Sequence, residues 1–464
     1  MGQNIAYNKS YIYAISLISA MGGLLFGYDW VVIGGAKPFY ELYFGISTIP
    51  ALQGWAMSCA LVGCLLGAVI SGMLNNRYGL KKLLILAAFI FIISSIGTGI
   101  SNSLYQFVMW RIFGGVSIGL ASNLSPMYIA EVSPAEYRGK FVTINQLTIV
   151  IGILIAQITN WLIAKPVPTD FSTVEILNSW NGQTGWRWMF WATAVPSSLF
   201  FILMFLVPES PRWLVKNNKL KEAEKVLVKI YSSLYAASEI ENISKSLLST
   251  QEQSKTKILL SSGIKKVLLI GITLAVFQQW CGINVIFNYA QEIFETAGYG
   301  VSDILFNIVI TGSVNLVFTF VALYTVDLVG RRKLMLTGAG GLAIIYSIVG
   351  TLYFFKITGF LLLLLVVTAI AFYAMSLAPV TWVILSEIFP NKIRSTAMAI
   401  STFALWSACF ILTYTFPILN DLLKSYGTFW LYGFICISGF LFIFIKLPET
   451  KGKSLEAIEK EIVG

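Results

Sequence analysis

Long apolar stretches separated by short polar segments fill most of the chain. A transmembrane helix needs roughly 20 consecutive apolar residues, and twelve segments have that character: 11–36, 51–74, 83–101, 104–131, 140–164, 187–207, 265–295, 303–326, 334–354, 359–387, 396–420 and 428–447. Apolar and polar residues do not alternate within these segments, which excludes a twelve-stranded barrel. The pattern therefore predicts an all-α membrane protein with twelve transmembrane helices.

The composition agrees with this prediction. The chain is 57% hydrophobic and 12% charged, whereas about a quarter of the residues of a soluble protein are charged. The first segment has little basic sequence before it and no clear cleavage site, so we expect a retained span and not a signal peptide. The five cysteines lie in apolar segments and the chain has no histidine, so no metal and no cofactor is expected.

The distribution of basic residues predicts the orientation in the membrane. Of the 32 Lys and Arg residues, 26 fall on one side; Arg111 lies inside a segment, and the opposite side holds Lys37, Lys165, Arg187, Lys356 and Lys424. The positive-inside rule places both termini in the cytoplasm and the protein in the cell (cytoplasmic or inner) membrane. The net charge of +10 is therefore explained by the basic residues that set the membrane topology, and no nucleic-acid partner is expected.

Three short motifs occur twice, in the same order. "NNRYGLKK" (75–82) pairs with "VDLVGRRK" (326–333), "EVSPAEYRGK" (131–140) with "EIFPNKIRS" (387–395), and "VPESPRWL" (207–214) with "LPETKGK" (447–453). Such a repeat indicates duplicated six-helix halves, which is typical of transporters. We predict six-helix bundles at 1–208 and 263–450, a cytoplasmic helical linker at 209–262 and a cytoplasmic tail at 451–464.

The charged residues of these motifs are candidates for a network that holds the halves together on the cytoplasmic side and opens when the cavity faces inward. The candidates are Arg77, Glu131, Arg138, Glu209, Arg331, Glu387, Arg394 and Glu449. A compatible alternative is that these charges only signal topology. In the linker, apolar residues at helical spacing (Leu220, Ala223, Val226, Leu227 and Ile230) predict an amphipathic helix.

With these motifs, the chain resembles the sugar porter family of the major facilitator superfamily. The resemblance covers nearly the whole length and rests on R-x3-G-x3-G (Arg111, Gly115, Gly119), "SPMYIAEVSP", "PESPRWL", "QQWCGIN", "DLVGRRK", "PVTWVILSEIFP" and "PET". It is similar to bacterial proton-coupled pentose and hexose symporters and to facilitative glucose transporters. The departures from the family pattern are Asn76, Leu80, Ile153, Ala378 and Leu405.

A monosaccharide site needs amides, which both donate and accept hydrogen bonds, and an aromatic plane for the C–H face of the ring. Amides inside a membrane are functional candidates by default. The resemblance assigns sugar contact to Gln146, Gln278, Gln279, Asn284, Asn315 and Trp382, with Phe26, Tyr289 and Trp406 as wall residues. Alternatively, the amides only join neighbouring helices and the aromatic residues only pack.

The spacing within the seventh segment predicts an interruption of its helix. Gln278 and Asn284 are six residues apart, which is about 240° around a straight helix. They face one cavity only if the helix bends. Gly282 lies between them, and glycine is a known cause of helix kinks. We therefore predict a broken seventh span, as many transporters have.

Asp29 and Arg111 are expected to be the only charges well inside the spans of the N-terminal half. Each lies seven residues from the predicted outer end of its segment, which puts both roughly 10 Å below the outer boundary. This equal depth makes an ion pair possible. The family resemblance gives Asp29 the role of proton carrier, with Arg111 as its partner; the alternative is a static structural pair.

The sequence therefore predicts monosaccharide–proton symport by alternating access, with a single copy sufficient for function. The partners are a monosaccharide, a proton and the lipid bilayer. The alternatives are a facilitative uniporter and, more remotely, a transporter-like sugar sensor, which usually has a long signalling tail. An enzyme is not expected, since no nucleophile–base set and no phosphate-binding loop is found.

Overall fold

The computed structural model describes residues 7–134, 138–168, 171–231, 233–249, 262–296, 298–357, 359–390 and 393–451. Part of the predicted linker (250–261) and most of the predicted tail (452–464) lie outside these ranges. The regular elements are helices: α1 (Lys9–Tyr43), α2 (Pro50–Tyr78), α3 (Leu80–Ile100), α4 (Leu104–Val132), α5 (Arg138–Ile163), α6 (Thr173–Asn178), η1 (Asn181–Gly185), α7 (Trp186–Ala192), α8 (Ala194–Met204), α9 (Pro211–Lys216), α10 (Leu220–Ile230), α11 (Ser233–Ser249), α13 (Ser262–Trp280), α14 (Ile283–Asn288), α15 (Ala290–Thr296), α16 (Val301–Val329), α17 (Arg331–Phe354), α18 (Phe360–Met375), α19 (Leu377–Ile388) and α20 (Arg394–Lys446).

The apolar helices match the predicted segments. In the described ranges, eleven helices are long and apolar enough to cross a membrane. The last of them, α20, covers the two predicted segments 396–420 and 428–447 and has non-helical backbone at Lys424 (φ 58°, ψ 171°) between them. The eleven helices therefore account for all twelve predicted spans.

The first helix is longer than the sequence pattern predicts. It continues to Tyr43 with Pro38 inside it, so Lys37 does not lie in a loop. Lys37 is 1% exposed and Glu41 is 4% exposed, and the two form an ion pair at 3.0 Å across one helical turn. The structure thus buries two further charges beyond the predicted span 11–36, where a carboxylate one turn along the helix compensates the lysine.

By their internal contacts, the described residues form two compact units. The first takes its residues from Met1–Asp29, Val62–Ile153 and Phe190–Gln253, and the second from Trp30–Leu61, Leu154–Met189 and Ser254–Gly464. The division falls inside α1, α2, α5 and α7, so these units are groups of residues that pack together and do not follow the helix boundaries. The bundle boundaries given by the motif repeat stay a prediction, and the two units are described separately below.

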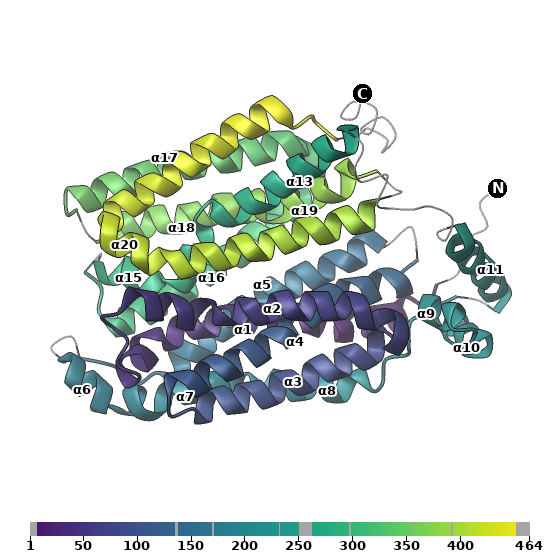
Figure 1. Ribbon diagram of the computed structural model, residues 1–464, viewed down its shortest axis with the longest axis horizontal. Helices are drawn as coiled ribbons and strands as arrows, with labels where there is room; N and C mark the ends of the chain where they lie inside the picture. The colour runs from purple at the N-terminus through teal and green to yellow at the C-terminus, as the bar shows by residue number, and fades with distance from the viewer. Residues whose placement is uncertain are drawn as a thin grey trace. The chain divides into compact units, whose positions relative to one another are not determined.

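In the first unit, α3 packs against α4 and α8 (Figure 1). Phe107 of α4 meets Phe190 of α7 edge to face, with ring centroids 5.6 Å apart. The predicted linker helix is α10, which packs against α9 and α11. It buries Ala223, Val226, Leu227 and Ile230, which confirms the predicted amphipathic face, whereas Leu220 at its first turn is exposed.

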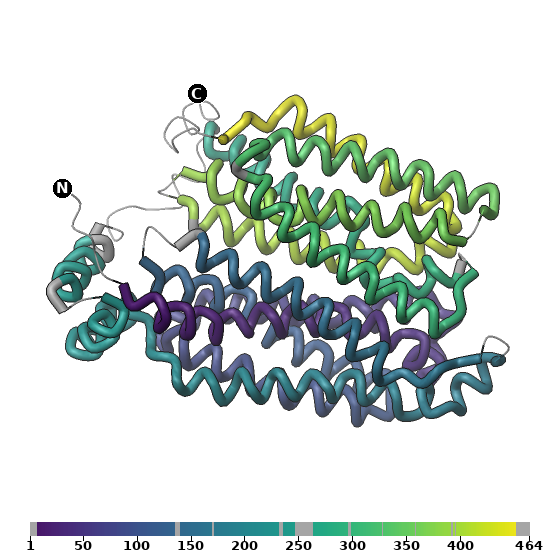
Figure 2. Tube along the Cα trace, turned by 180° about the vertical axis from the view of Figure 1, so that it is seen from behind, coloured from purple at the N-terminus to yellow at the C-terminus, as the bar shows by residue number. Residues whose placement is uncertain are grey.

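In the second unit, α17 packs against α18 and α20, and α13 against α19 and α20. The same helices can be followed from the opposite side in Figure 2. Phe429 of α20 lies between two tyrosines of α17, with ring centroids 5.7 Å from Tyr346 and 5.6 Å from Tyr353. Such aromatic contacts add to the burial of apolar area that holds these helices together.

Candidate functional site

The seventh span is broken where the sequence predicts. α13 ends at Trp280, and α14 begins at Ile283. Gly282 between them has a left-handed backbone (φ 85°, ψ −4°), a conformation that costs an L-residue roughly 1–2 kcal/mol. A Cβ at this position would also lie 2.9 Å from the Tyr432 ring. The break therefore depends on glycine for two reasons.

Gly282→Ala is expected to lower the thermal unfolding temperature of the purified protein, because it combines backbone strain with a clash against Tyr432. Gly298 is a matched control: its φ is 90°, and a Cβ there would meet nothing within 4 Å. Gly298→Ala should therefore carry only the strain, about 1–2 kcal/mol, and Gly282→Ala more. Equal effects in a thermal melt would contradict the steric part of this explanation.

The break brings three predicted amides into one hydrogen-bonded chain. Gln279 Nε2 donates to Gln278 Oε1 at 2.9 Å, and Asn284 Nδ2 donates to Gln279 Oε1 across the break. All three residues are buried. A bent helix thus presents its amides together, as the spacing argument requires, and each amide orients the next.

The tenth span is also interrupted, which the sequence pattern does not predict. α18 ends at Met375 and α19 begins at Leu377, with Ser376 at φ −133° and ψ −86° between them. Gln278 Nε2 donates to the Ala378 carbonyl oxygen at 3.3 Å, so the amide chain reaches this second break. Trp382 lies on α19 beyond it and is half-buried.

Asn315, a predicted sugar ligand, is buried on α16. The structure also places a second buried amide, Gln157, close to this helix, which the sequence analysis did not select. A Cβ on Gly312 of α16 would meet the side chain of Gln157 of α5. Gln157 is buried, and neither polar atom of its side chain has a hydrogen-bond partner within the described part of the protein. A buried amide without a partner is costly, so Gln157 is a further candidate for ligand contact. The sequence contains the feature that could have identified Gln157, because it is an amide within the apolar segment 140–164.

The two predicted aromatic wall residues of this unit are buried. The Tyr289 hydroxyl donates to the Thr413 carbonyl oxygen at 2.6 Å, so this group is used within the protein. The Trp406 ring packs edge to face against Trp30, with centroids 6.2 Å apart. These contacts fit packing as well as a wall role, and the wall assignment stays a prediction.

In the first unit, Asp29 and Arg111 form the ion pair that their equal predicted depth made possible. Arg111 Nη1 donates to both carboxylate oxygens of Asp29, at 2.8 and 2.9 Å. The two residues are 7% and 4% exposed. The guanidinium carbon lies 5.6 Å from the centre of the Phe190 ring. An aromatic face therefore supports the cation beside its carboxylate partner.

The other predicted ligands of the first unit lie on α1 and α5. Phe26 and Gln146 are both half-buried. The two helices are in close contact, since a Cβ on Gly27 would lie 2.8 Å from the Ile149 carbonyl carbon. Phe26 and Gln146 therefore belong to one packed helix pair, and their contact with a sugar stays a prediction.

At the ends predicted to face the cytoplasm, the repeated motifs build the same cap twice. Glu209 accepts hydrogen bonds from the first two backbone N–H groups of α3 at 3.0 and 3.1 Å. Glu449 does the same for α17 at 2.9 and 3.2 Å. Gly79 and Gly330 precede these helices with φ of 89° and 101°. Burial raises the pKa of the Glu209 carboxyl, and its backbone N–H donors oppose that rise.

Three of the candidate network residues make contacts within the C-terminal half. Arg331 forms an ion pair with Glu387 at 3.1 Å. Arg394 Nε donates to the Phe389 carbonyl oxygen at 3.2 Å. These contacts join α17, α19 and the start of α20 at one end of the helices.

The corresponding N-terminal residues behave differently. Glu131 accepts a hydrogen bond from the Ser210 hydroxyl. Arg77 is exposed, and its guanidinium lies 5.3 Å from the centre of the Tyr78 ring. Arg138 begins α5, and its side chain lies outside the described part of the structure. The gating role of all eight residues stays a prediction.

Comparisons with known proteins identify the family of this chain. Residues 15–462 match the model of a family described as sugar (and other) transporters. The D-xylose-proton symporter of Escherichia coli is 38% identical, with 98% of this chain and 96% of that protein aligned. The arabinose-proton symporter of Bacillus subtilis is also 38% identical, with the same shares aligned.

Solved structures give the same result. The xylose transporter XylE of Escherichia coli in an inward-open conformation has a TM-score of 0.84 at 36% identity, covering 97% of this chain and 100% of that one. A further XylE structure, described as a major facilitator superfamily proton:xylose symporter, has a TM-score of 0.80 at 37% identity, covering 98% and 100%. The chain is thus a multi-pass membrane transporter with the twelve-helix major facilitator fold, and it belongs to the sugar (and other) transporter family.

Proposed function

We propose that this protein imports a monosaccharide, a pentose or a hexose, together with a proton by alternating access. The family and the names of its relatives support the substrate class. The observation that carries proton coupling is the buried ion pair between Asp29 and Arg111. The protein works in the cytoplasmic membrane as a monomer with both termini in the cytoplasm.

The sugar is held by amides, which match a ring of hydroxyl groups because each amide both donates and accepts. The proposed ligands are Gln146, Gln278, Gln279, Asn284, Asn315 and Trp382, with Phe26, Tyr289 and Trp406 as walls. The hydrogen bond from Gln278 to the Ala378 carbonyl is long, at 3.3 Å. A sugar hydroxyl can replace this acceptor at small cost.

Proton coupling follows from the two states of the Asp29 carboxyl. An ionised Asp29 holds Arg111; a proton taken from the outside neutralises the carboxyl and releases the guanidinium to rearrange against Phe190. Loss of the ion pair between Asp29 and Arg111 shifts the equilibrium between the outward-facing and inward-facing states. Loss of the proton to the cytoplasm restores the pair.

The direct test is uptake of labelled pentoses and hexoses into liposomes that contain the purified protein, with and without an inward proton gradient. A gradient of one pH unit stores about 1.4 kcal/mol per proton, which supports an accumulation of about tenfold at one proton per sugar. Accumulation that follows the gradient supports symport. Equilibration without accumulation in every gradient indicates the alternative, a uniporter in which Asp29 and Arg111 are a fixed pair.

Gln157→Leu is expected to weaken sugar binding without harming the fold. Both polar atoms of the Gln157 side chain lack a partner in the described ranges, so removing them relieves a buried unsatisfied amide and leaves stability unchanged or raised by about 1 kcal/mol. If the sugar is the missing partner, the half-saturation concentration rises about tenfold. A lower unfolding temperature with unchanged half-saturation would contradict the ligand assignment.

A further inference from the structure

A buried lysine lies between two carboxylates at the C-terminal end of α1. Lys37 Nζ lies 3.0 Å from Glu41 Oε1 on the same helix and forms an ion pair with Glu292 of α15. Gln53 of α2 donates to Glu41 Oε2 at 3.0 Å. We call Lys37, Glu41 and Glu292 the lysine–dicarboxylate cluster. It joins α1 to α15 within the second unit.

The charges of the cluster do not balance. One ammonium faces two carboxylates, so the cluster carries one excess negative charge when all three groups are ionised. A further side chain that acts on Glu292, Glu295 of α15, is also acidic. Among the described residues, the other titratable or charged groups around the cluster include Tyr40, Tyr289, Tyr353, Lys356, Asp421, Lys424, Tyr426 and Tyr432. Of these, Lys424 pairs with Asp421 at 3.8 Å, and both side chains are well exposed.

An excess charge at this depth has a high free-energy cost. The Lys37 and Glu41 side chains are 2% and 5% exposed, and the Tyr289 ring lies 5.5 Å from the Lys37 ammonium. A buried net charge is neutralised by a proton or a counter-ion, or the site opens to water. Two carboxylates that share one site commonly retain one proton between them.

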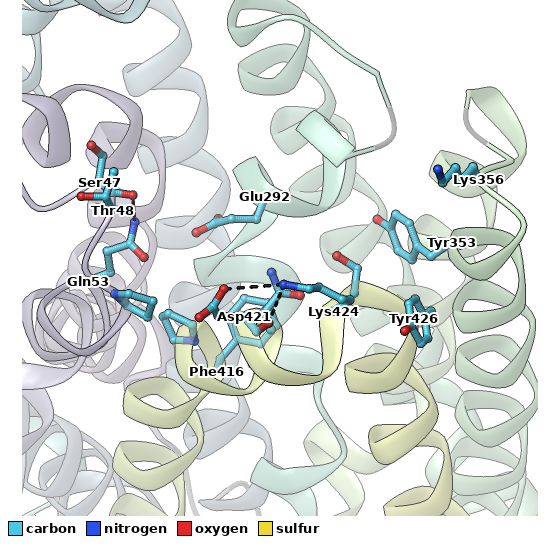
Figure 3. A pocket seen from close by; sticks show the side chains of 14 residues that line it. Ser47, Thr48, Gln53, Glu292, Tyr353, Lys356, Phe416, Asp421, Lys424 and Tyr426 are labelled. Atoms are coloured by element: carbon cyan, nitrogen blue, oxygen red, sulfur yellow. Dashed lines mark hydrogen bonds and ion pairs between the residues drawn. The ribbon is translucent and has the colours of Figure 1, made fainter.

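A pocket open to solvent lies beside Glu292 of the cluster. It has a volume of about 580 Å³, and Glu292 and Gln53 are among its lining residues (Figure 3). The Glu292 side chain is 23% exposed and lines the pocket, although its Oε2 atom is buried; a small opening beside this side chain would let water reach the carboxylate. Two other lining residues, Lys356 and Lys424, have left-handed backbones with φ of 56° and 58°. Strained residues of this kind gather at functional sites.

We propose that the lysine–dicarboxylate cluster is a second proton-binding site, which takes its proton through this pocket and holds α1 against α15. The proton binds a carboxylate oxygen of Glu41 or Glu292 and leaves the cluster neutral, with Lys37 bridging both groups. When the proton leaves to water in the pocket, the excess charge draws water between α1 and α15. The site therefore closes this end in acid and loosens it in alkali, independently of any proton on Asp29.

Infrared spectroscopy tests this proposal directly in the full-length Asp29→Asn protein in liposomes, where the Asp29 carboxyl is absent. At neutral pH we expect the carbonyl stretch of a protonated buried carboxyl, which is lost when the sample is titrated to alkaline pH. Glu41→Gln and Glu292→Gln should each remove the band, because the remaining carboxylate forms a balanced pair with Lys37. Lys37→Met should strengthen it, because two carboxylates then lack the ammonium.

Glu241→Gln is the matched control, since this glutamate is 66% exposed and pairs with Lys245 on α11. It should leave the band unchanged. A band that survives both cluster substitutions, or no band at neutral pH, overturns the proton site. This outcome is distinct from failure of sugar–proton symport, because neither sugar nor transport enters the measurement.

A second measurement tests the holding of α1 against α15. In the otherwise unaltered protein, sugar exchange should depend on external pH in the range where the infrared band titrates. Glu41→Gln and Glu292→Gln should both remove that dependence, while Glu241→Gln retains it. A cluster that titrates in the infrared spectra while both variants keep the unaltered pH profile overturns the gating role.

Discussion

Asp29→Asn is expected to abolish proton-driven accumulation of sugar while sugar exchange across the membrane continues. The amide has nearly the shape of the carboxyl and still accepts from Arg111 through its oxygen. It cannot take up a proton in the working pH range, so the release of Arg111 is no longer linked to the gradient. In an inward gradient of one pH unit, the accumulation ratio should fall from about ten to about one.

The experiment compares accumulation and exchange in the same liposomes. Asp303→Asn is the matched control, because Asp303 lies in the first turn of α16 and is exposed. It should keep both activities. Loss of exchange as well as accumulation in Asp29→Asn would point to a structural role of the pair. Full accumulation in Asp29→Asn would exclude Asp29 as the proton carrier.

Arg111 needs a different treatment, since its removal alone leaves a buried carboxylate without its partner. Breaking a buried ion pair from one side costs about 3–5 kcal/mol. Arg111→Gln should therefore reduce the yield of folded protein, and the double variant with Asp29→Asn should recover it. The recovery separates the contribution of the pair to stability from its contribution to coupling.

Two features of the site could be predicted because simple helix geometry fixes them. Asp29 and Arg111 occur at equal depth on antiparallel spans, and the structure brings them within 2.8 Å. Gln278 and Asn284 could meet only across a bend, and Gly282 supplies it with φ 85°. In both cases the prediction needed only the rise or the rotation per residue of a helix.

Other features depend on contacts between segments far apart in the sequence. The first apolar segment was predicted to end at residue 36, but α1 continues to Tyr43, where Glu41 and Glu292 compensate Lys37. The partner Glu292 is distant in the sequence, so nothing near Lys37 shows that the lysine is buried. The break at Ser376 was missed although Pro379 follows in the first turn of α19, where proline is tolerated.

The repeated glutamates, Glu209 and Glu449, bind the ends of nearby helices, which is a more local role than the predicted gating network. Glu209 and Glu449 were predicted as members of a gating network. In the structure each caps the first turn of a helix, α3 or α17. Negative charge at a helix N-terminus is stabilising, and a gating role would have to include the breaking of these caps. The motif repeat located the residues but not their hydrogen-bond partners.

Gln278→Ala is expected to raise the half-saturation concentration for sugar by about ten- to a hundredfold. Gln278 is a residue of the seventh span that connects it to the tenth span. Its amide donates to the Ala378 carbonyl oxygen of the tenth span and accepts a hydrogen bond from Gln279, its neighbour in the seventh. Its loss removes a sugar ligand and also leaves Gln279 without its acceptor. Each lost hydrogen bond of this kind costs about 1–3 kcal/mol, and 1.4 kcal/mol is tenfold in affinity.

The change should appear in binding and not in proton coupling, because Asp29 and Arg111 lie elsewhere in the chain and keep their ion pair. Uptake at saturating sugar should therefore still accumulate substrate in a proton gradient, with the half-saturation concentration shifted. Gln183→Ala is the matched control, since Gln183 is exposed and lies in η1. An unchanged half-saturation concentration in Gln278→Ala would mean that the amide chain only joins the two broken helices, and the sugar would have to be held by other residues.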